Sequence, residues 1–139
     1  MKVSKIIYPD QENIVGFEES GWKMQQKEPH INGKVVFLIN GRAISYCESF
    51  MSFIEHYKLA EIVGQPTAGT NGNVNPFLLP GGFKIMWTGM KVLKHDGSQH
   101  HLIGIQPTVH VERTIQGVIE GRDEFLEKAL EIIKETGSE

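Results

Sequence analysis

The sequence contains little cysteine and no long apolar run. Its single cysteine, Cys47, cannot form a disulfide within the chain, which leaves the redox compartment undecided. The longest uninterrupted apolar run covers residues 35–39, far short of the roughly 20 residues that a membrane-spanning helix needs. Residues 1–8 hold two lysines and only a broken apolar stretch, which does not fit a secretory signal. We therefore expect no membrane span and find no export signal in these residues.

Clustered positive charge is also lacking. The 14 lysine and arginine residues are scattered along the chain, and the net charge is −3. Nucleic-acid-binding domains usually carry a basic patch, because contacts to phosphates supply much of their affinity. The sequence therefore predicts no nucleic-acid partner.

Patterns typical of metal and nucleotide sites are incomplete. His95, His100 and His101 flank an Asp-Gly pair without the spacing of a metal site, and we expect them to form a solvated hairpin tip. The segment from Gly64 to Thr70 imitates a phosphate-binding loop but lacks the lysine that reaches the phosphates. We therefore expect no metal and no cofactor.

The composition and the apolar pattern are typical of one α/β domain. Hydrophobic residues make up 40% of the 139 residues and charged residues 22%, which is a globular balance. Residues 35–39 lie between Asn-Gly pairs, which predicts a strand buried on both faces. A helix should follow and lead to a parallel strand at residues 61–63, as in a βαβ unit. The apolar stripe predicted for this helix comprises Tyr46, Phe50, Phe53, Ile54 and Tyr57.

Three further β elements are expected downstream. Residues 77–79 and 83–87 flank Pro-Gly-Gly and should form a β-hairpin. Short strands are expected at residues 90–93 and 109–111. No internal repeat or low-complexity tract interrupts this order.

The two ends of the chain differ in pattern. A last helix should be capped near Asp123, with Glu124 and Lys128 paired across one turn. Residues 1–33 show no sustained helical or strand period and should form an irregular arm or linker. Residues 34–139 are then expected to form the folded part.

Ser45 follows the first predicted strand and opens the first predicted helix. A hydroxyl there lies among backbone N–H groups that lack a partner within the helix, as a nucleophile beside an oxyanion hole would. Ser45 and Glu48 also fit the capping-box pattern, in which both side chains bind the helix start. The two interpretations differ in whether the Ser45 hydroxyl binds a backbone N–H or stays available to a base. The pattern alone leaves both open.

Several motifs together resemble a known family. The segment from Asn40 to Glu48 (NGRAISYCE) is similar to the nucleophile segment of the tail-specific, or C-terminal processing, serine peptidases, where a strand ending in Asn precedes S-A-S-E. The likeness continues in the same order over roughly residues 34–133 through VGQPTAG, the LPGG of the hairpin, GIQPT, which is similar to the family's G-I-x-P-D, and GRD. It implies Ser45 as the nucleophile, Glu48 as a supporting group and the Tyr46 N–H as an oxyanion donor. Substrate would then lie along Gly69, Asn71 and Gly72.

One position departs from the family pattern. The processing peptidases carry a lysine as general base in T-F-G-K-G, whereas Thr70 stands at that position here. A threonine hydroxyl cannot take up a proton at neutral pH, so the base must come from elsewhere. A branch similar to the tricorn peptidases uses a histidine upstream of the nucleophile, and the one upstream histidine in this chain is His30. The resemblance favours a histidine in a segment that this chain lacks.

The resemblance implies both a fold and a function. We expect an α/β fold of the Clp-protease and crotonase type, a mixed sheet with packed helices, of which this chain is the C-terminal part. The parent protein would be an exported or periplasmic serine endopeptidase acting on peptides or unfolded C-termini, with this chain alone inactive. A homo-oligomer or a missing N-terminal half would complete the sheet. The alternative is a non-catalytic module that binds peptides or hydrophobic ligands, similar to interphotoreceptor retinoid-binding modules.

Overall fold

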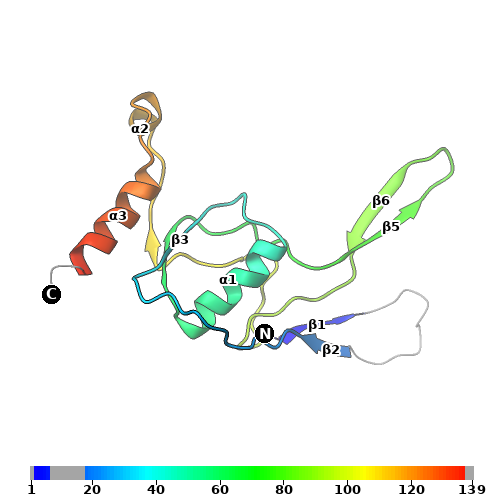
Figure 1. Ribbon diagram of the computed structural model, residues 1–139. Helices are drawn as coiled ribbons and strands as arrows, with labels where there is room; N and C mark the ends of the chain where they lie inside the picture. The colour runs from blue at the N-terminus through cyan, green and yellow to red at the C-terminus, as the bar shows by residue number, and fades with distance from the viewer. Residues whose placement is uncertain (1, 7–17, 137–139) are drawn as a thin grey trace.

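The structure, a computed structural model, describes residues 2–6 and 18–136 (Figure 1). Its elements follow in the order β1 (Lys2–Ile6), β2 (Glu18–Gly21), β3 (Val36–Ile39), α1 (Tyr46–Tyr57), β4 (Glu61–Gly64), β5 (Val74–Leu78), β6 (Lys84–Thr88), β7 (Val109–His110), α2 (Ile115–Ile119) and α3 (Glu124–Thr136).

Two parallel strands joined by a helix form the centre of the fold. β3 and β4 pair in parallel, with Val36 opposite Glu61 and Ile39 opposite Gly64, and α1 connects them. β7 pairs in parallel with the other edge of β4, which gives the strand order β3-β4-β7. The predicted α/β fold with its βαβ unit is therefore confirmed, and the short strand predicted near residue 109 is present.

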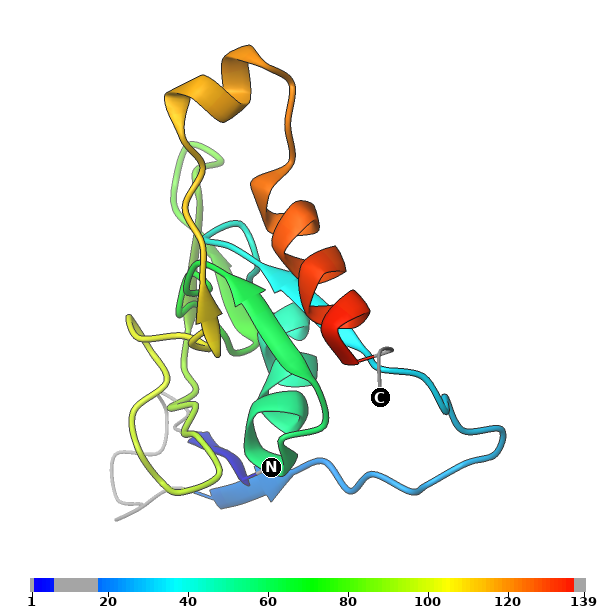
Figure 2. The ribbon, with the colours of Figure 1, turned by 90° about the vertical axis from the view of Figure 1, so that its left-hand side faces the viewer.

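The two faces of this sheet are covered by different helices. Because successive side chains of a strand point to opposite faces, Ile62 packs with α1 whereas Val63 faces α3. Figure 2 shows α1 and α3 on either side of the strands. Leu38, which is beside Val63 in register, is nonetheless 43% exposed. The prediction that the first strand is buried on both faces is therefore wrong for β3, because α3 covers only part of its face.

The inward face of α1 matches the predicted apolar stripe only at Phe53 and Ile54. Tyr46 and Tyr57 are 71% and 57% exposed, whereas Glu48, Met51 and Ile54, three residues apart, are buried. The prediction counted apolar residues alone and could not include a buried carboxylate. Glu48 turns inward to bind the loop after β4, and the face that carries Met51 and Ile54 turns inward with it.

β5 and β6 form the predicted hairpin, which lies apart from the central sheet. The two strands are antiparallel, with Val74 opposite Thr88 and Leu78 opposite Lys84. In Figure 1 the hairpin projects away from α1 and the parallel strands. Many of its apolar side chains are exposed, and Leu78 is 72% exposed.

The segment after the hairpin folds differently from the prediction. No strand forms at residues 90–93, where the structure has only isolated bridge positions at Met90 and at Leu93, which pairs with Gln99. The chain reverses at the predicted Asp-Gly turn, because the Gly97 N–H donates to the Lys94 carbonyl at 2.9 Å. The pairing across this turn does not lengthen into a ladder, because His100, the residue after Gln99, turns in against Glu48 of α1 and is buried there.

The last helix begins where the sequence predicts, but its first turn has different partners. The Leu126 N–H donates to Asp123 Oδ1 at 3.2 Å, which confirms the cap. The predicted pair of Glu124 with Lys128 is wrong, since Glu124 binds Thr114 and Lys128 pairs with Glu131 at 3.0 Å. The short helix α2, which the sequence pattern did not predict, brings Thr114 to the start of α3.

The N-terminal part of the chain contributes one further strand pair. β1 and β2 are antiparallel, with Lys2 opposite Gly21, and lie within residues 1–33, for which the sequence predicted an irregular arm or linker. No helix in the described ranges is both long enough and apolar enough to span a membrane.

Candidate active site

Ser45 lies at the carboxyl edge of the parallel sheet, between the end of β3 and the start of α1. Its backbone has φ 53° and ψ −117°, a conformation with positive φ that residues other than glycine rarely adopt. The Ser45 N–H donates to the Thr70 carbonyl at 2.8 Å, which ties this turn to the loop after β4. A strained serine between a strand and a helix is a recurring feature of nucleophile turns, because the strain exposes the hydroxyl.

The capping-box interpretation of Ser45 and Glu48 is wrong. The Ser45 side chain makes no capping hydrogen bond to the helix. Glu48 Oε1 instead accepts from the Thr67 hydroxyl at 2.7 Å and from the Gly69 N–H at 2.6 Å. The glutamate therefore supports the loop that holds Ser45 rather than the start of α1.

Of the three histidines near the Asp-Gly turn, only His95 lies at a solvated tip. His100 is 2% exposed, and its Nε2 lies 3.3 Å from Glu48 Oε2. His101 is half-buried, whereas His95 is exposed and stacks on His56 with 3.4 Å between the ring centroids. The prediction of a solvated tip is therefore wrong for His100 and His101, because the chain after the turn folds back against α1.

Ser45 opens into a cavity of about 370 Å³. The residues that the sequence associated with substrate, Gly69, Asn71 and Gly72, line it together with Thr70. The remaining walls are mostly apolar and come from Ile44, Val74, Trp87, Thr88, His101 and Leu102. The structure thus brings the predicted serine and the predicted substrate residues to one cavity, with a wall from the β5–β6 hairpin.

The loop residues of this cavity are held in place by specific contacts. Gly69 has φ +67°, and a Cβ atom there would lie 2.8 Å from the backbone nitrogens of Leu102 and Ile103. Asn71 uses its side-chain amide to bind both α1 and the loop, donating to Ser49 Oγ at 3.0 Å and accepting from the Gly72 N–H at 2.8 Å. The loop is therefore preorganised by contacts within itself, with α1 and with the segment at residues 102–103.

A general base for Ser45 is not provided by the histidines of the described residues. His101 lines the cavity, but its Nε2 accepts the Val92 N–H at 3.0 Å, so the neutral ring carries its proton on Nδ1. The nitrogen with the lone pair is thus already occupied. His30 is exposed, contacts Gln26 and Glu28, and does not line the Ser45 cavity.

The start of α1 lies beside Ser45 and carries the N–H of Tyr46, the predicted oxyanion donor. Tyr46 is the first residue of this helix, and the N–H groups of a first turn have no acceptor within the helix. Together with the helix dipole they favour negative charge beside Ser45. In the described part of the chain, no three His, Cys, Asp or Glu side chains are grouped so as to hold a metal ion.

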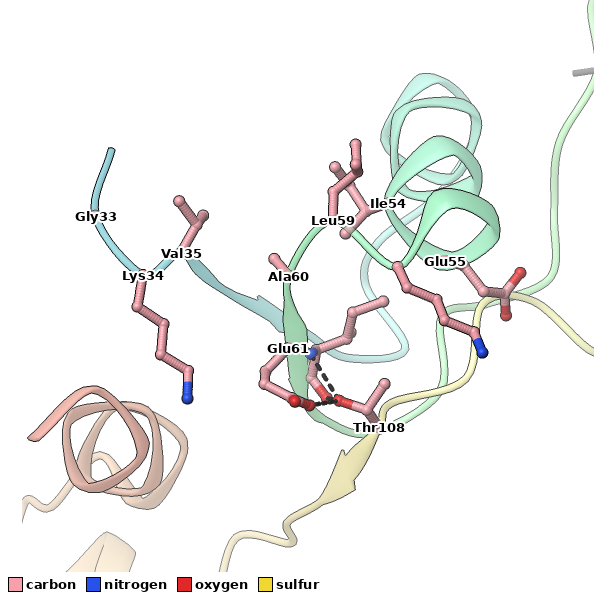
Figure 3. A pocket seen from close by; sticks show the side chains of 11 residues that line it. Gly33, Lys34, Val35, Ile54, Glu55, Leu59, Ala60, Glu61 and Thr108 are labelled. Carbon is pink, nitrogen blue, oxygen red and sulfur yellow. Dashed lines mark hydrogen bonds between the residues drawn. The ribbon is translucent and has the colours of Figure 1, made fainter. Parts of the chain in front are cut away.

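A second cavity, of about 530 Å³, lies at the opposite edge of the sheet (Figure 3). Residues before β3 and at the start of β4 line it, including Lys34 and Glu61. The Thr108 hydroxyl closes one side by bonding Glu61 and the backbone of Ile62. None of the residues that the sequence predicted for the site lines this cavity.

Comparison with known proteins relates this site to a family of peptidases. The profile of Peptidase family S41 matches residues 3–111. A candidate peptidase from Parabacteroides merdae ATCC 43184 has a similar structure, with 22% identity and a TM-score of 0.69 over 78% of this chain. Mature CPAF complexed with lactacystin is 28% identical, with a TM-score of 0.62 over 68% of the chain. The tricorn protease is 20% identical, with a TM-score of 0.65 over 74% of the chain.

The match covers only a part of each of these solved chains. This chain spans 34% of the Parabacteroides merdae chain, 19% of the CPAF chain and 10% of the tricorn chain. None of the curated proteins matches the chain. The match to the family profile covers most of the 139 residues and includes both Ser45 and the loop that holds it. This chain belongs to Peptidase family S41.

Proposed function

We propose that Ser45 is the nucleophile of a serine peptidase whose catalytic domain extends beyond these 139 residues. The observation that carries the proposal is the Ser45 turn, where a serine with positive φ makes no capping bond and opens into a cavity. A serine placed only to cap α1 would bind a first-turn N–H instead. The small share of the solved relatives that this chain covers supports a longer catalytic domain.

The geometry suggests how the reaction would proceed. Ser45 Oγ would attack the scissile carbonyl and lose its proton to a base, and the Tyr46 N–H would stabilise the tetrahedral oxyanion. Glu48 would support the loop behind the nucleophile, with Thr70 bound to Ser45 through its carbonyl. We propose that the base is a histidine outside this chain, because Thr70 cannot serve and His101 Nε2 is occupied.

The cavity also suggests what the peptidase would act on. Its apolar walls would accept an apolar side chain of a peptide or of an unfolded C-terminus. Substrate would add as a strand beside the sheet, a mode in which main-chain hydrogen bonds tolerate varied sequences. The family resemblance further supports an exported or periplasmic location, which fractionation of cells that express the full-length protein would test.

A fluorophosphonate probe tests the nucleophile directly in the full-length protein that contains this chain. We expect labelling at Ser45, complete loss of labelling in Ser45→Ala, and unchanged labelling in Ser52→Ala. Ser52 is a suitable control because it lies on the same helix and does not line the Ser45 cavity.

The alternative is a non-catalytic binding module of the same fold. The threonine at position 70 and the occupied nitrogen of His101 favour it, because both deprive Ser45 of a base within this chain. A full-length protein that is well folded, leaves the probe unreacted and still binds an apolar peptide would establish the alternative and refute the peptidase.

A further inference from the structure

A buried pair of an acid and an imidazole lies beneath the loop that holds Ser45. Glu48 has no exposed surface and His100 is 2% exposed. Glu48 Oε2 and His100 Nε2 face each other at 3.3 Å without the geometry of a hydrogen bond, and neither atom has a hydrogen-bond partner among the described residues. An ionised carboxylate away from water is costly unless its oxygens are bonded. Among the described residues, His100 Nε2 is the polar atom that the structure places beside Oε2.

The other oxygen of the same carboxylate leads to the serine. Glu48 Oε1 accepts two hydrogen bonds, from the hydroxyl of Thr67 and from the N–H of Gly69. The next residue, Thr70, offers its carbonyl to the Ser45 N–H at 2.8 Å. His100 is thus linked to the backbone of Ser45 through the carboxylate of Glu48 and through the loop residues Gly69 and Thr70.

We propose that His100 is a positioning residue for Ser45, an inference that rests on the proposed function. The imidazole of His100 lies against Glu48 Oε2 in the protein interior and fixes the position of the carboxylate. The other oxygen, Oε1, then stays in place to accept the Gly69 N–H at 2.6 Å. Without the His100 ring, the buried carboxylate loses the polar group beside it and can shift, and the carbonyl of Thr70 is no longer held against Ser45.

The family motif contains Ser45 and Glu48 but not this histidine. The three elements that meet here are the first turn of α1, the loop after β4 and the segment before Gly104. His100 is the residue through which the third of these segments reaches the carboxylate. It does not line the cavity of Ser45, so its influence on the reaction would be indirect.

The first test uses NMR of the 139-residue chain and requires no turnover. In His100→Leu we expect amide hydrogen exchange at Gly69 and Ser45 to accelerate at least tenfold, with an upfield shift of the Gly69 amide proton. His100→Gln retains an N–H donor and should restore most of the protection. His110→Leu is the matched control, because His110 is exposed and pairs only with Glu112 at 3.2 Å among the described residues.

Two results would overturn the proposal: unchanged Gly69 and Ser45 amides in a folded His100→Leu, or no rescue by His100→Gln. If His100→Leu does not fold, the double variant Glu48→Gln/His100→Leu replaces the test. Recovery of folding in the double variant supports the proposal, because the carboxylate of Glu48, left without His100, is then what prevents His100→Leu from folding. Failure to recover overturns it.

The second test separates this inference from the identity of the nucleophile. In the full-length protein we expect His100→Leu to lower the rate of fluorophosphonate labelling at least tenfold, with rescue by His100→Gln. If the wild type is labelled and His100→Leu is labelled at the same rate, the role of His100 is contradicted. Absence of labelling in the wild type, with the amide effects intact, would instead contradict the role of Ser45.

Discussion

Gly104 brings the segment that follows His100 into close contact with Thr67. Its φ is +68°, and a Cβ atom there would lie 2.4 Å from Thr67 Oγ1 and 2.7 Å from the Thr67 carbonyl oxygen. The same Thr67 hydroxyl donates to Glu48 and accepts the Ile105 N–H at 2.8 Å. A side chain at position 104 would therefore disturb the contacts that bury the carboxylate.

This contact predicts a large loss of stability for Gly104→Ala. We expect the free energy of unfolding to fall by about 2–4 kcal/mol, because backbone strain and a backbone clash add together. Gly121→Ala is the matched control, since Gly121 has φ +69° and nothing within 4 Å of the added Cβ. Its expected loss is about 1 kcal/mol, from strain alone. Urea denaturation followed by circular dichroism measures both, and equal losses would contradict the role of the contact.

The residues of the site could be predicted from the sequence only where a local motif carries them. Ser45 was located by its position between a strand and a helix. The partners of Glu48 could not be predicted, because an S-x-x-E pattern fits a capping box equally well and because Gly69 lies 21 residues further along the chain. The burial of His100 had no local signal, because it results from the chain folding back onto α1.

At the scale of elements, α2 and α3 are joined by one side chain. Glu124, the first residue of α3, accepts from the N–H and from the hydroxyl of Thr114, each at 2.7 Å. Thr114 in turn caps α2 by accepting the Gly117 N–H at 2.9 Å. The hydrogen bonds from the Thr114 side chain and backbone lower the pKa of Glu124 below its usual value of 4.5.

This shift predicts that the α2–α3 junction loosens in acid. A carboxylate whose pKa is lower in the folded state stabilises that state above its unfolded pKa. The contribution disappears as the pH falls through the folded pKa. Because intrinsic amide exchange itself slows in acid, the measured quantity is the protection factor, the ratio of intrinsic to observed exchange rate. We expect the protection factors of the Thr114 and Gly117 amides to fall as the pH drops below about 4.5, the usual pKa of Glu124.

The control for this effect is a carboxylate on the same helix. In Glu124→Gln the two amides should exchange quickly already at neutral pH, with little further change in acid. Glu131→Gln should leave the pH dependence intact, because Glu131 pairs with Lys128 and not with α2. An unaltered acid response in Glu124→Gln would point to Glu127, whose pKa Arg122 lowers, as the group responsible.

The elements that the sequence predicted well are those with a sustained pattern. β3, α1, β4 and the β5–β6 hairpin each have an apolar run, a helical period or a turn sequence of their own. α2 was missed because it has five residues, too few for a helical period to be visible. Its position depends on Glu124, a tertiary contact that no local pattern shows.

At the scale of the whole molecule, much apolar surface is left uncovered. Leu38 on the sheet and the hairpin residues Leu78 and Phe83 are substantially exposed, as are Ile115 and Ile119 of α2. Soluble monomers rarely expose large continuous apolar patches, and such patches usually mark an interface. The prediction that a missing N-terminal half or a second copy completes the sheet remains a prediction, and this exposure is consistent with it.

The hydrogen bond of His101 leads to a prediction about activity. We expect the isolated 139-residue chain to cleave peptides no faster than Ser45→Ala does, because the titratable side chain in the cavity, His101, has its Nε2 bonded to Val92. Without a base, the hydroxyl stays protonated at neutral pH and is a poor nucleophile. Fluorogenic peptides with an apolar residue before the scissile bond, incubated with the chain and analysed by mass spectrometry, would measure this. Cleavage by the wild-type chain that is lost in His101→Gln would show that the ring rearranges to serve as the base, and the need for a histidine from outside these residues would disappear.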